Sequence, residues 1–326
     1  MRKFLGITFL LLLGAGLWLA WAIFYPVHPS TNTFVLLHPG WSTKRIAAEL
    51  KGAGVIRSQR AFLLLHYLQP GSSLKAGEYK FDSPANSLQV RERIARGDIY
   101  THTVVIPEGY NIYDIAQVMQ DASLSTREEF LKAATDNVSL IADLDPQAKT
   151  LEGYLFPDTY QFTRTQNLPD MISVMVRRFQ DEAKKLGLNT NVRSTVTMAS
   201  IIEKETRVPE ERPIVASVYY NRLAKKMAFA ADPTVIYAAL LAQKWDGTIN
   251  QSDLQFDSPY NTYKHAGLPL GPIANPGVES LRAAMHPAQT NFYYFVADAQ
   301  GRHNFSNSYD QHVRNVAAYR RALGGK

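Results

Sequence analysis

The order of apolar and polar positions divides the chain into three stretches. Residues 4–25 form one uncharged apolar run that has no polar face. Between residues 34 and 104, short runs of β-forming residues alternate with the periodicity of helices, and after residue 120 helical periodicity dominates. This pattern predicts an α+β protein with a single N-terminal transmembrane helix, a small α/β module and a larger mixed α+β domain over residues 105–326.

The apolar run is long enough to cross a membrane. Its 22 residues, at about 1.5 Å each, span about 33 Å. The basic residues before it predict that residues 1–3 stay in the cytoplasm and that the chain after Tyr25 lies outside it. Trp18 and Trp21 lie near the far end, where interfacial aromatics occur. Two alternatives remain: a signal peptide cleaved after Ala20-Trp21-Ala22, or a buried helix of a soluble fold.

A strand–turn–helix unit occurs twice between the apolar run and residue 120. The first copy contains strand 34–37, a turn at Gly40 and a helix. The second copy contains strand 104–106, a turn at Gly109 and a helix, and its glycine follows Gly40 by 69 residues. The apolar helix positions match in both copies: Ile46, Ala47 and Leu50 in the first, Ile115, Ala116 and Met119 in the second. The unit resembles LysM modules, which bind glycans that contain N-acetylglucosamine. Residues 34–104 are therefore predicted to form a LysM-like module, with a plain βα building block as the alternative.

Composition excludes several kinds of function. The net charge is +6, but the basic residues stand in short pairs without interleaved aromatics, so no nucleic-acid partner is expected. The chain has no cysteine, which excludes disulfides, thiolate metal sites and a cysteine nucleophile. A metallohydrolase is an alternative, but the available metal ligands near the C-terminus do not have the spacing of known zinc sites. These residues are His265, His286, His303, His312, Asp298 and Asp310. Neither a metal nor another cofactor is predicted.

One glutamate lies on an apolar helical face. The segment from about 192 to 206 reads as helix, and Glu205 shares a face with Met198, Ile201, Ile202 and Val208. Glu203 points about 200° away from Glu205. A carboxyl group in apolar surroundings has a raised pKa, as a general acid near neutral pH requires. Spacing alone leaves another interpretation open, in which the helix ends before Glu205 or Glu205 pairs with Arg207 or Arg212.

The segment Glu203-Lys204-Glu205-Thr206 resembles the Glu-Lys-Glu-Thr motif of the endolytic murein transglycosylases, the MltG or YceG-like family. Further similarity covers nearly the whole chain after the apolar run, in segments 151–160, 216–218, 221–223, 232–237, 258–263, 267–269 and 271–277. The sequence departs from the family at Ala228, Ala230 and Ala231, where the family has a Pro-Leu-Gln-Ser-like stretch. The resemblance implies that residues 105–326 form a catalytic domain in which the second acid of the motif, Glu205, is catalytic.

The resemblance also implies a reaction. A protonated Glu205 gives its proton to the glycosidic oxygen between N-acetylmuramic acid and N-acetylglucosamine in peptidoglycan. The muramic C6 hydroxyl then closes on C1 to leave a 1,6-anhydro end. Internal cuts in nascent strands, termination of glycan polymerisation and partnership with penicillin-binding glycan polymerases follow from the same resemblance. The alternative is a non-catalytic glycan-binding scaffold for cell-wall synthesis enzymes.

Supporting residues are predicted from the long loop 258–277 and from the segment around Gly153. Aromatic side chains in the loop can stack on sugars, and an amide there can orient an N-acetyl group. Glu203 is a candidate for a second proton-transfer or orienting role, whereas Asp158 and Asp232 fit turn or cap chemistry. The predicted supporting or substrate-binding residues are Glu203, Glu152, Tyr260, Asn261 and Tyr263.

Overall fold

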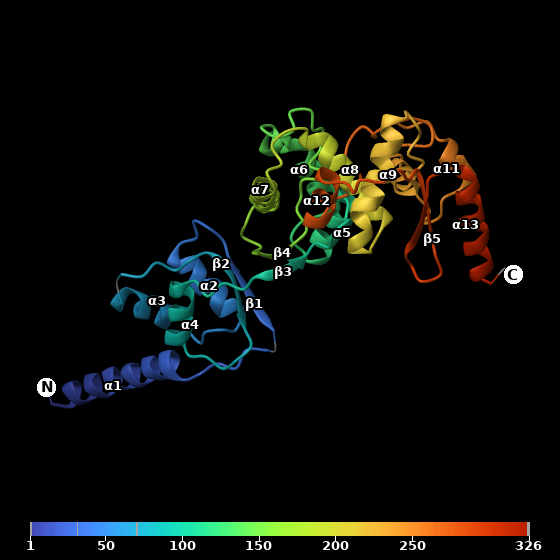
Figure 1. Ribbon diagram of the computed structural model, residues 1–326. Helices are drawn as coiled ribbons and strands as arrows, with labels where there is room; N and C mark the ends of the chain where they lie inside the picture. The colour runs from blue at the N-terminus through green and yellow to red at the C-terminus, as the bar shows by residue number, and fades with distance from the viewer. Residues whose placement is uncertain (1, 31, 70, 325–326) are drawn as a thin grey trace. The chain divides into compact units, whose positions relative to one another are not determined.

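The computed structural model describes residues 2–30, 32–69 and 71–324. The chain divides into two compact units (Figure 1): unit 1 contains Met1–Thr103 and Gln161–Asn167, and unit 2 contains Val104–Tyr160 and Leu168–Lys326. Helices make up most of both units, and the described strands pair two by two, β1 with β2, β3 with β4 and β5 with β6. The mixed α+β class predicted from the sequence is confirmed.

The N-terminal helix α1 (Arg2–Phe24) is the one described helix that is long and apolar enough to cross a membrane, with a mean hydropathy of 2.2 over Phe4–Phe24. Most of its side chains are exposed, which separates it from the buried core helix of a soluble protein. Its last turn differs, because Ala22 and Ile23 are buried in unit 1. The helix has the length and composition of a membrane anchor or of a signal sequence.

The core of unit 1 forms between one antiparallel strand pair and three short helices. Strands β1 (Thr33–Leu37) and β2 (Gly77–Phe81) pair in a register that places Val35 opposite Tyr79. The helices are α2 (Thr43–Gly52), α3 (Gln59–Leu68) and α4 (Ser87–Arg96), and their N-caps are Ser42, Ser58 and Asn86. Leu37, Leu50, Phe62 and Tyr79 are among the side chains that fill the space between sheet and helices.

Unit 2 is built mainly from helices. After strand β3 (His102–Val105) its elements are α5 (Ile112–Asp121), α6 (Arg127–Asp136), η1 (Val138–Ile141), β4 (Thr159–Phe162), α7 (Leu168–Leu186), α8 (Val192–Glu205), η2 (Pro209–Glu211), α9 (Arg212–Ala224), α10 (Asp232–Leu241), α11 (Gln251–Gln255), α12 (Val278–Met285), β5 (Tyr294–Ala297), β6 (His303–Ser306) and α13 (Tyr309–Ala322). Strand β4, strand β6 and helix α11 were not predicted, because each is too short to show a clear period.

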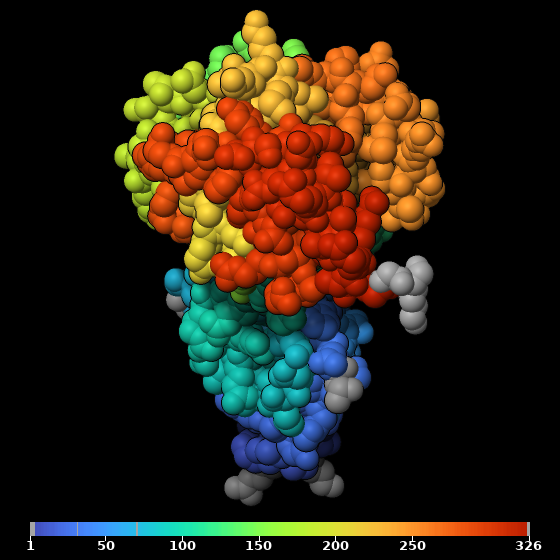
Figure 2. Space-filling view, turned by 45° about the vertical axis from the view of Figure 1, so that its right-hand side comes forward, coloured from blue at the N-terminus to red at the C-terminus, as the bar shows by residue number. Residues whose placement is uncertain are grey.

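Helix α8 lies at the centre of unit 2. It contacts α9, α10 and α12, and its residues from Val196 to Ile202 are buried in succession (Figure 1). A helix packed on several sides loses the simple division into an apolar and a polar face, which the sequence pattern had suggested. The C-terminal elements β5, β6 and α13, coloured red, cover one face of unit 2 (Figure 2).

A long segment without helix or strand follows α11, as the sequence predicted for residues 258–277. It is ordered by buried side chains, among them Asn261, Thr262 and Asn275. The loop also packs against Gly153, whose φ is +89° and where a Cβ atom would lie 2.6 Å from Pro272. Only glycine fits that close approach, so the segments 151–160 and 267–277 depend on each other.

Candidate active site

Glu205 is the last residue of α8. The helix ends there because Thr206 has extended backbone angles and its hydroxyl accepts the Val208 backbone N–H at 3.1 Å. The Glu205 carboxyl accepts a hydrogen bond of 2.8 Å from the hydroxyl of Tyr219, which lies on the neighbouring helix α9. The interpretation in which the helix stops before Glu205 is therefore wrong.

Tyr219 is a buried neighbour of the Glu205 carboxyl. It is 1% exposed and contacts the rings of Phe229 and Phe295, with ring centroids 5.0 and 5.9 Å away. Burial and the neighbouring Glu205 raise the pKa of the Tyr219 hydroxyl well above its usual value, so it remains a proton donor. Its position is fixed by packing, and it holds one carboxyl oxygen of Glu205 in place.

Two charged groups act on Glu205 from other elements. Asp232, at the start of α10, raises its pKa, and Arg222 of α9 lowers it. Asp232 accepts a hydrogen bond of 2.6 Å from the hydroxyl of Tyr263 in the long loop. We call these five residues, Glu205, Tyr219, Arg222, Asp232 and Tyr263, the Glu205 group. Asp232 was expected to cap α10, but Ala231 takes the cap position and Asp232 is the first helical residue.

The surroundings of Glu205 raise its pKa to about 7, mainly through desolvation. The hydrogen bond from Tyr219 opposes that rise. The side chain is nevertheless partly exposed to solvent. Because Glu205 is densely surrounded by protein and still partly exposed, a ligand atom can approach it from its exposed side. Near neutral pH a large fraction of Glu205 is therefore protonated and able to donate a proton.

Glu203 occupies a different environment on the other side of α8. Its carboxyl is 5% exposed, lies 3.0 Å from the guanidinium of Arg212 and accepts the backbone N–H of Gly277 at 2.9 Å. Gly277 is the N-cap of α12, so Glu203 also satisfies a free amide at the start of that helix. Arg212 therefore pairs with Glu203 and not with Glu205, and no described basic side chain forms an ion pair with Glu205.

The predicted loop residues have separate roles. Tyr263 belongs to the Glu205 group through its bond to Asp232. Asn261 is fully buried, and its amide donates to the backbone carbonyls of Asp253, Leu254 and Phe256 at 3.2, 3.2 and 2.8 Å. Asn261 thus orders the loop, and its amide is not available to a substrate.

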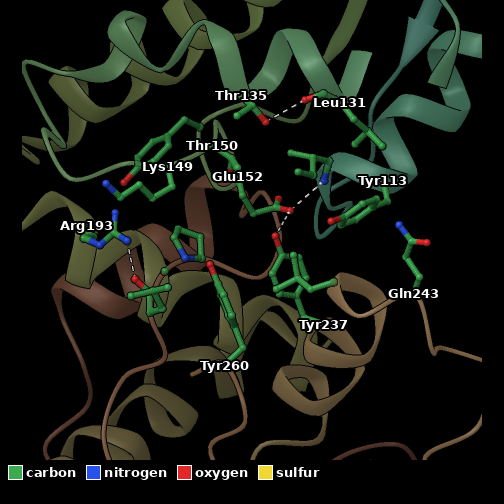
Figure 3. A pocket seen from close by; sticks show the side chains of 16 residues that line it. Tyr113, Leu131, Thr135, Lys149, Thr150, Glu152, Arg193, Tyr237, Gln243 and Tyr260 are labelled. Carbon is green, nitrogen blue, oxygen red and sulfur yellow. Dashed lines mark hydrogen bonds between the residues drawn. The ribbon is translucent and has the colours of Figure 1, made fainter. Parts of the chain in front are cut away.

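Glu152 and Tyr260 line a separate pocket of about 310 Å³ to which Glu205 does not contribute (Figure 3). Glu152 accepts hydrogen bonds from the Ile112 backbone N–H at 3.0 Å, from the Tyr237 hydroxyl at 2.9 Å and from the Asn275 amide at 3.0 Å. Burial raises the pKa of Glu152 to about 8. Both of its oxygens are satisfied by the protein, so Glu152 positions its partners. We call this cavity the Glu152 pocket.

The histidines considered for a metal site lie in unrelated places. His303 contacts Glu211 at 2.7 Å, and His265 contacts Asp257 at 2.8 Å. Within the described ranges no three His, Asp or Glu side chains come together in a way that could hold a metal ion.

Sequence reasoning did not single out Tyr219 or Arg222. Both follow Glu205 by more than ten residues, on the next helix, so no periodicity within α8 points to them. The signal available from the sequence was indirect, because Arg222 lies within segment 221–223, which carries part of the resemblance, and Tyr219 lies between that segment and segment 216–218.

Comparison with known proteins gives a consistent result. Residues 35–318 match the profile of the YceG-like family. An endolytic murein transglycosylase of Bacillus subtilis is 33% identical over 334 residues, which cover 95% of this chain and 91% of that protein. An endolytic murein transglycosylase of Streptococcus pneumoniae is 27% identical, and the match covers 96% of this chain and 64% of the longer pneumococcal protein.

A solved structure shows the same relationship. The crystal structure of a putative YceG-like protein from Listeria monocytogenes is 33% identical and superposes with a TM-score of 0.58, covering 87% of this chain and 99% of that one. The extent of these matches, over both units and with the Glu205 group inside the matched residues, shows that this chain belongs to the YceG-like family of endolytic murein transglycosylases.

Proposed function

We propose that this protein is a lytic transglycosylase in which Glu205 acts first as acid and then as base. The observation that carries the proposal is a carboxyl group with a pKa of about 7 that is partly exposed and whose one hydrogen-bond partner among the described residues is a buried tyrosine. The names of the relatives support peptidoglycan as the substrate. Most glycosidases that hydrolyse this kind of bond use two carboxyl groups, one of which activates the attacking water.

The proposed reaction consumes no water. The Glu205 carboxyl transfers its proton to the glycosidic oxygen, and the bond from that oxygen to C1 of the muramic residue breaks. The Glu205 carboxylate then takes the proton of the muramic C6 hydroxyl, whose oxygen forms the new bond to C1. The products are a free N-acetylglucosamine hydroxyl and a 1,6-anhydro-muramyl end, and Glu205 is protonated again.

Asp232 stabilises the reacting sugar in this proposal. Its side chain is exposed, and it lies near enough to Glu205 to raise the pKa of that carboxyl. A negative charge there stabilises the positive charge that develops at C1 when the glycosidic bond breaks. Tyr263, which donates to Asp232, keeps that carboxylate in position.

The chemical identity of the products tests the mechanism. Purified full-length protein is incubated with uncrosslinked glycan strands, and the new ends are identified by mass spectrometry. Anhydro-muramyl ends are expected. Reducing ends would instead show that Asp232 and Glu205 work as a hydrolytic pair, and the absence of any new end would favour the non-catalytic scaffold.

The dependence of activity on pH is expected to respond in opposite directions to two substitutions. The protonated form of Glu205 is the active acid, so activity falls as pH rises through its pKa of about 7. Tyr219→Phe removes a hydrogen bond that lowers this pKa, so the alkaline limb of the pH–rate profile should move to higher pH. Asp232→Asn removes a charge that raises it, so the limb should move to lower pH. Shifts in the same direction, measured as kcat/KM against pH, would contradict the assignment.

We further propose that α1 is a retained anchor that holds the protein in the inner membrane with both units on the periplasmic side. Its length and hydropathy support this placement, and its buried last turn gives a packing reason to retain it. Protein extracted from membranes is expected to have the mass of the full chain. A mass that corresponds to a start near residue 23 would show a cleaved signal peptide.

Internal cutting of nascent strands, termination of polymerisation and partnership with penicillin-binding glycan polymerases belong to the same proposal. Their support is the word "endolytic" in the names of the relatives and an anchor that limits the enzyme to strands close to the membrane. Glycan binding by the predicted LysM-like module, residues 34–104, remains a prediction.

A further inference from the structure

The Glu152 pocket extends to the opposite end of α8 from Glu205. Arg193, in the first turn of that helix, lines the pocket, and it precedes Glu205 by twelve residues. At 1.5 Å per residue the two positions are about 18 Å apart along the helix axis. We propose that the Glu152 pocket is a second binding site for the glycan strand, remote from the cleaved bond, that takes a muramyl unit with its acidic substituent. This inference rests on the proposed function.

Three tyrosine rings form part of the pocket wall. Tyr237 lies between the other two, with its ring centroid 6.5 Å from that of Tyr113 and 5.0 Å from that of Tyr260. The hydrogen bond from its hydroxyl to Glu152 fixes its orientation (Figure 3). The hydroxyls of Tyr113 and Tyr260 have no hydrogen-bond partner in the described part of the protein. Flat rings with free hydroxyls at their edges suit a pyranose, which has C–H faces and hydroxyl edges.

The charges around the pocket favour an acidic group. Lys149 is exposed at the rim and forms no ion pair with any described residue. Arg193, on the same side of the view in Figure 3, is already bound to Asp145 at 2.8 Å and to the Leu270 carbonyl at 2.5 Å. Because the Glu152 carboxyl is also satisfied, the free charge at the rim is the Lys149 ammonium. In peptidoglycan, the muramic residue carries carboxylates on its lactyl-peptide arm, and N-acetylglucosamine carries none.

A pocket at this distance makes binding depend on strand length. A strand that reaches both the Glu205 group and the Glu152 pocket gains the second set of contacts, whereas a short fragment held at Glu205 does not. The pocket would therefore select long strands for cutting and set the shortest strand that binds well.

Binding to catalytically idle protein tests the pocket independently of cleavage. In a Glu205→Gln background, Lys149→Gln and Tyr260→Phe together should weaken binding of long uncrosslinked strands about tenfold, equivalent to about 1.4 kcal/mol. Binding of a short fragment should change much less. The matched control is Lys132→Gln, because Lys132 is an exposed lysine of α6 that pairs with Asp136 outside the pocket.

Equal weakening for long and short strands, or no change for long strands, would overturn the distal site. Either result leaves the proposed function untouched, since that depends on whether wild-type protein forms anhydro ends. If wild-type protein forms none while the length-dependent binding is present, the catalytic proposal fails and the pocket remains.

Helix α3 of unit 1 carries exposed apolar side chains beside its contact with α1. Ala61 and Leu65 pack on Ala22 and Ile23 of the anchor helix. The neighbouring side chains on the helix surface are exposed: Leu64 is 40% exposed and Tyr67 and Leu68 are each 70% exposed. We infer that this face of α3 lies in the headgroup region of the bilayer, which rests on the proposal that α1 is a membrane anchor.

The length of α1 carries this second inference. The apolar span Phe4–Phe24 has 21 residues, so it is about 31 Å long and just covers a hydrocarbon core of about 30 Å. The whole apolar span is needed to cross the hydrocarbon core, so its last residues, Leu19 to Ile23, lie at the outer boundary of the membrane. Helix α3 packs on the last turn of α1, so it lies at the same depth in the membrane as that turn.

Arg57, Trp21 and Tyr25 form a basic and aromatic cluster at the same depth in the membrane. The Arg57 guanidinium donates to the Pro26 carbonyl at 2.7 Å and lies over the rings of Trp21 and Tyr25, 4.6 and 4.9 Å from their centroids. Arginine with tryptophan and tyrosine is the combination found where proteins meet lipid headgroups. The apolar face of α3 therefore has a lipid bilayer as its partner.

The natural sequence contains no cysteine, so a single introduced cysteine can be labelled specifically and its depth in the bilayer measured. Full-length single-cysteine variants are labelled with an environment-sensitive fluorophore and reconstituted into vesicles that contain lipids with quenchers at known depths. A label at Leu68→Cys should be quenched several-fold more by shallow quenchers than one at Lys51→Cys, an exposed site on α2. A label at Leu12→Cys, within α1, reports on the anchor itself through deep quenchers.

The outcomes separate the two claims. Quenching at residue 12 without quenching at residue 68 would overturn the contact made by α3 and leave the anchor in place. Absence of quenching at both positions would show that α1 does not span the bilayer, and the inference would fall with it.

Discussion

Replacing Glu205 by Gln is expected to lower the rate of glycan cleavage by about 10²- to 10⁴-fold, the usual contribution of a general acid. Gln has nearly the same shape and can still accept the hydrogen bond from Tyr219, so the site keeps its packing. It cannot give a proton to the glycosidic oxygen. The measurement is the rate of formation of anhydro-muramyl ends by purified variant and wild-type protein.

The same variant should be more stable than wild type at alkaline pH. The pKa of Glu205 in the folded protein, about 7, lies above its ordinary value of 4.5, so ionisation costs folding free energy. The contribution of the protonated carboxyl is complete below pH 4.5 and is lost as pH rises through about 7. Gln does not ionise, so its melting temperature should exceed that of wild type above pH 7.

Glu210→Gln provides the matched control. Glu210 is an exposed glutamate in η2, five residues after Glu205, and it is outside the Glu205 group. Its substitution should change neither the cleavage rate nor the melting temperature appreciably. A Glu205→Gln variant that still forms anhydro ends at the wild-type rate would remove Glu205 from the mechanism.

Replacing Arg212 by Met is expected to destabilise the protein by about 3–5 kcal/mol, the usual cost of leaving a buried charge without its partner. The two side chains are 9% and 5% exposed, and their charged groups lie 3.0 Å apart. Loss of Arg212 leaves the Glu203 carboxylate with only the Gly277 amide as a described partner. Urea denaturation of both proteins at pH 7 measures the change in the free energy of unfolding.

The matched control is Arg282→Met. Arg282 pairs with Glu279 on the surface of α12, where both side chains are 52% exposed. Exposed pairs of this kind contribute about 0–1 kcal/mol, so this variant should unfold almost as wild type does. If both substitutions had equally small effects, the Glu203–Arg212 pair would not hold α8 and α9 together.

These two predictions distinguish the acids of the Glu-Lys-Glu segment by their surroundings. Glu205 lies at a reachable position with a raised pKa, and its loss should affect the rate. Glu203 is buried against an arginine and a helix N-terminus, and disturbing its pair should affect stability. Two identical residues separated by one lysine thus have different roles, because successive side chains of a helix point in different directions.

The sequence determined much of the local structure. The apolar run and helical periodicity placed α1 and α8 within one or two residues of their observed ends, because the period of a helix is a local property. The 200° separation between Glu203 and Glu205 also follows from helix geometry alone. The motif segments identified the family before any contact was known.

Only the tertiary structure decided what each acid touches. Tyr219 and Arg222 come from α9, Asp232 from α10 and Tyr263 from the loop. Asn261 was buried by the folding of that loop, and Glu152 was placed in a different pocket from Glu205. The pKa of a carboxyl depends on charges and solvent exclusion within a few ångströms, and those neighbours are distant in sequence. The sequence motif could therefore identify Glu205 as a candidate acid. Its raised pKa, which allows it to donate a proton near neutral pH, comes from the packing of helices around α8.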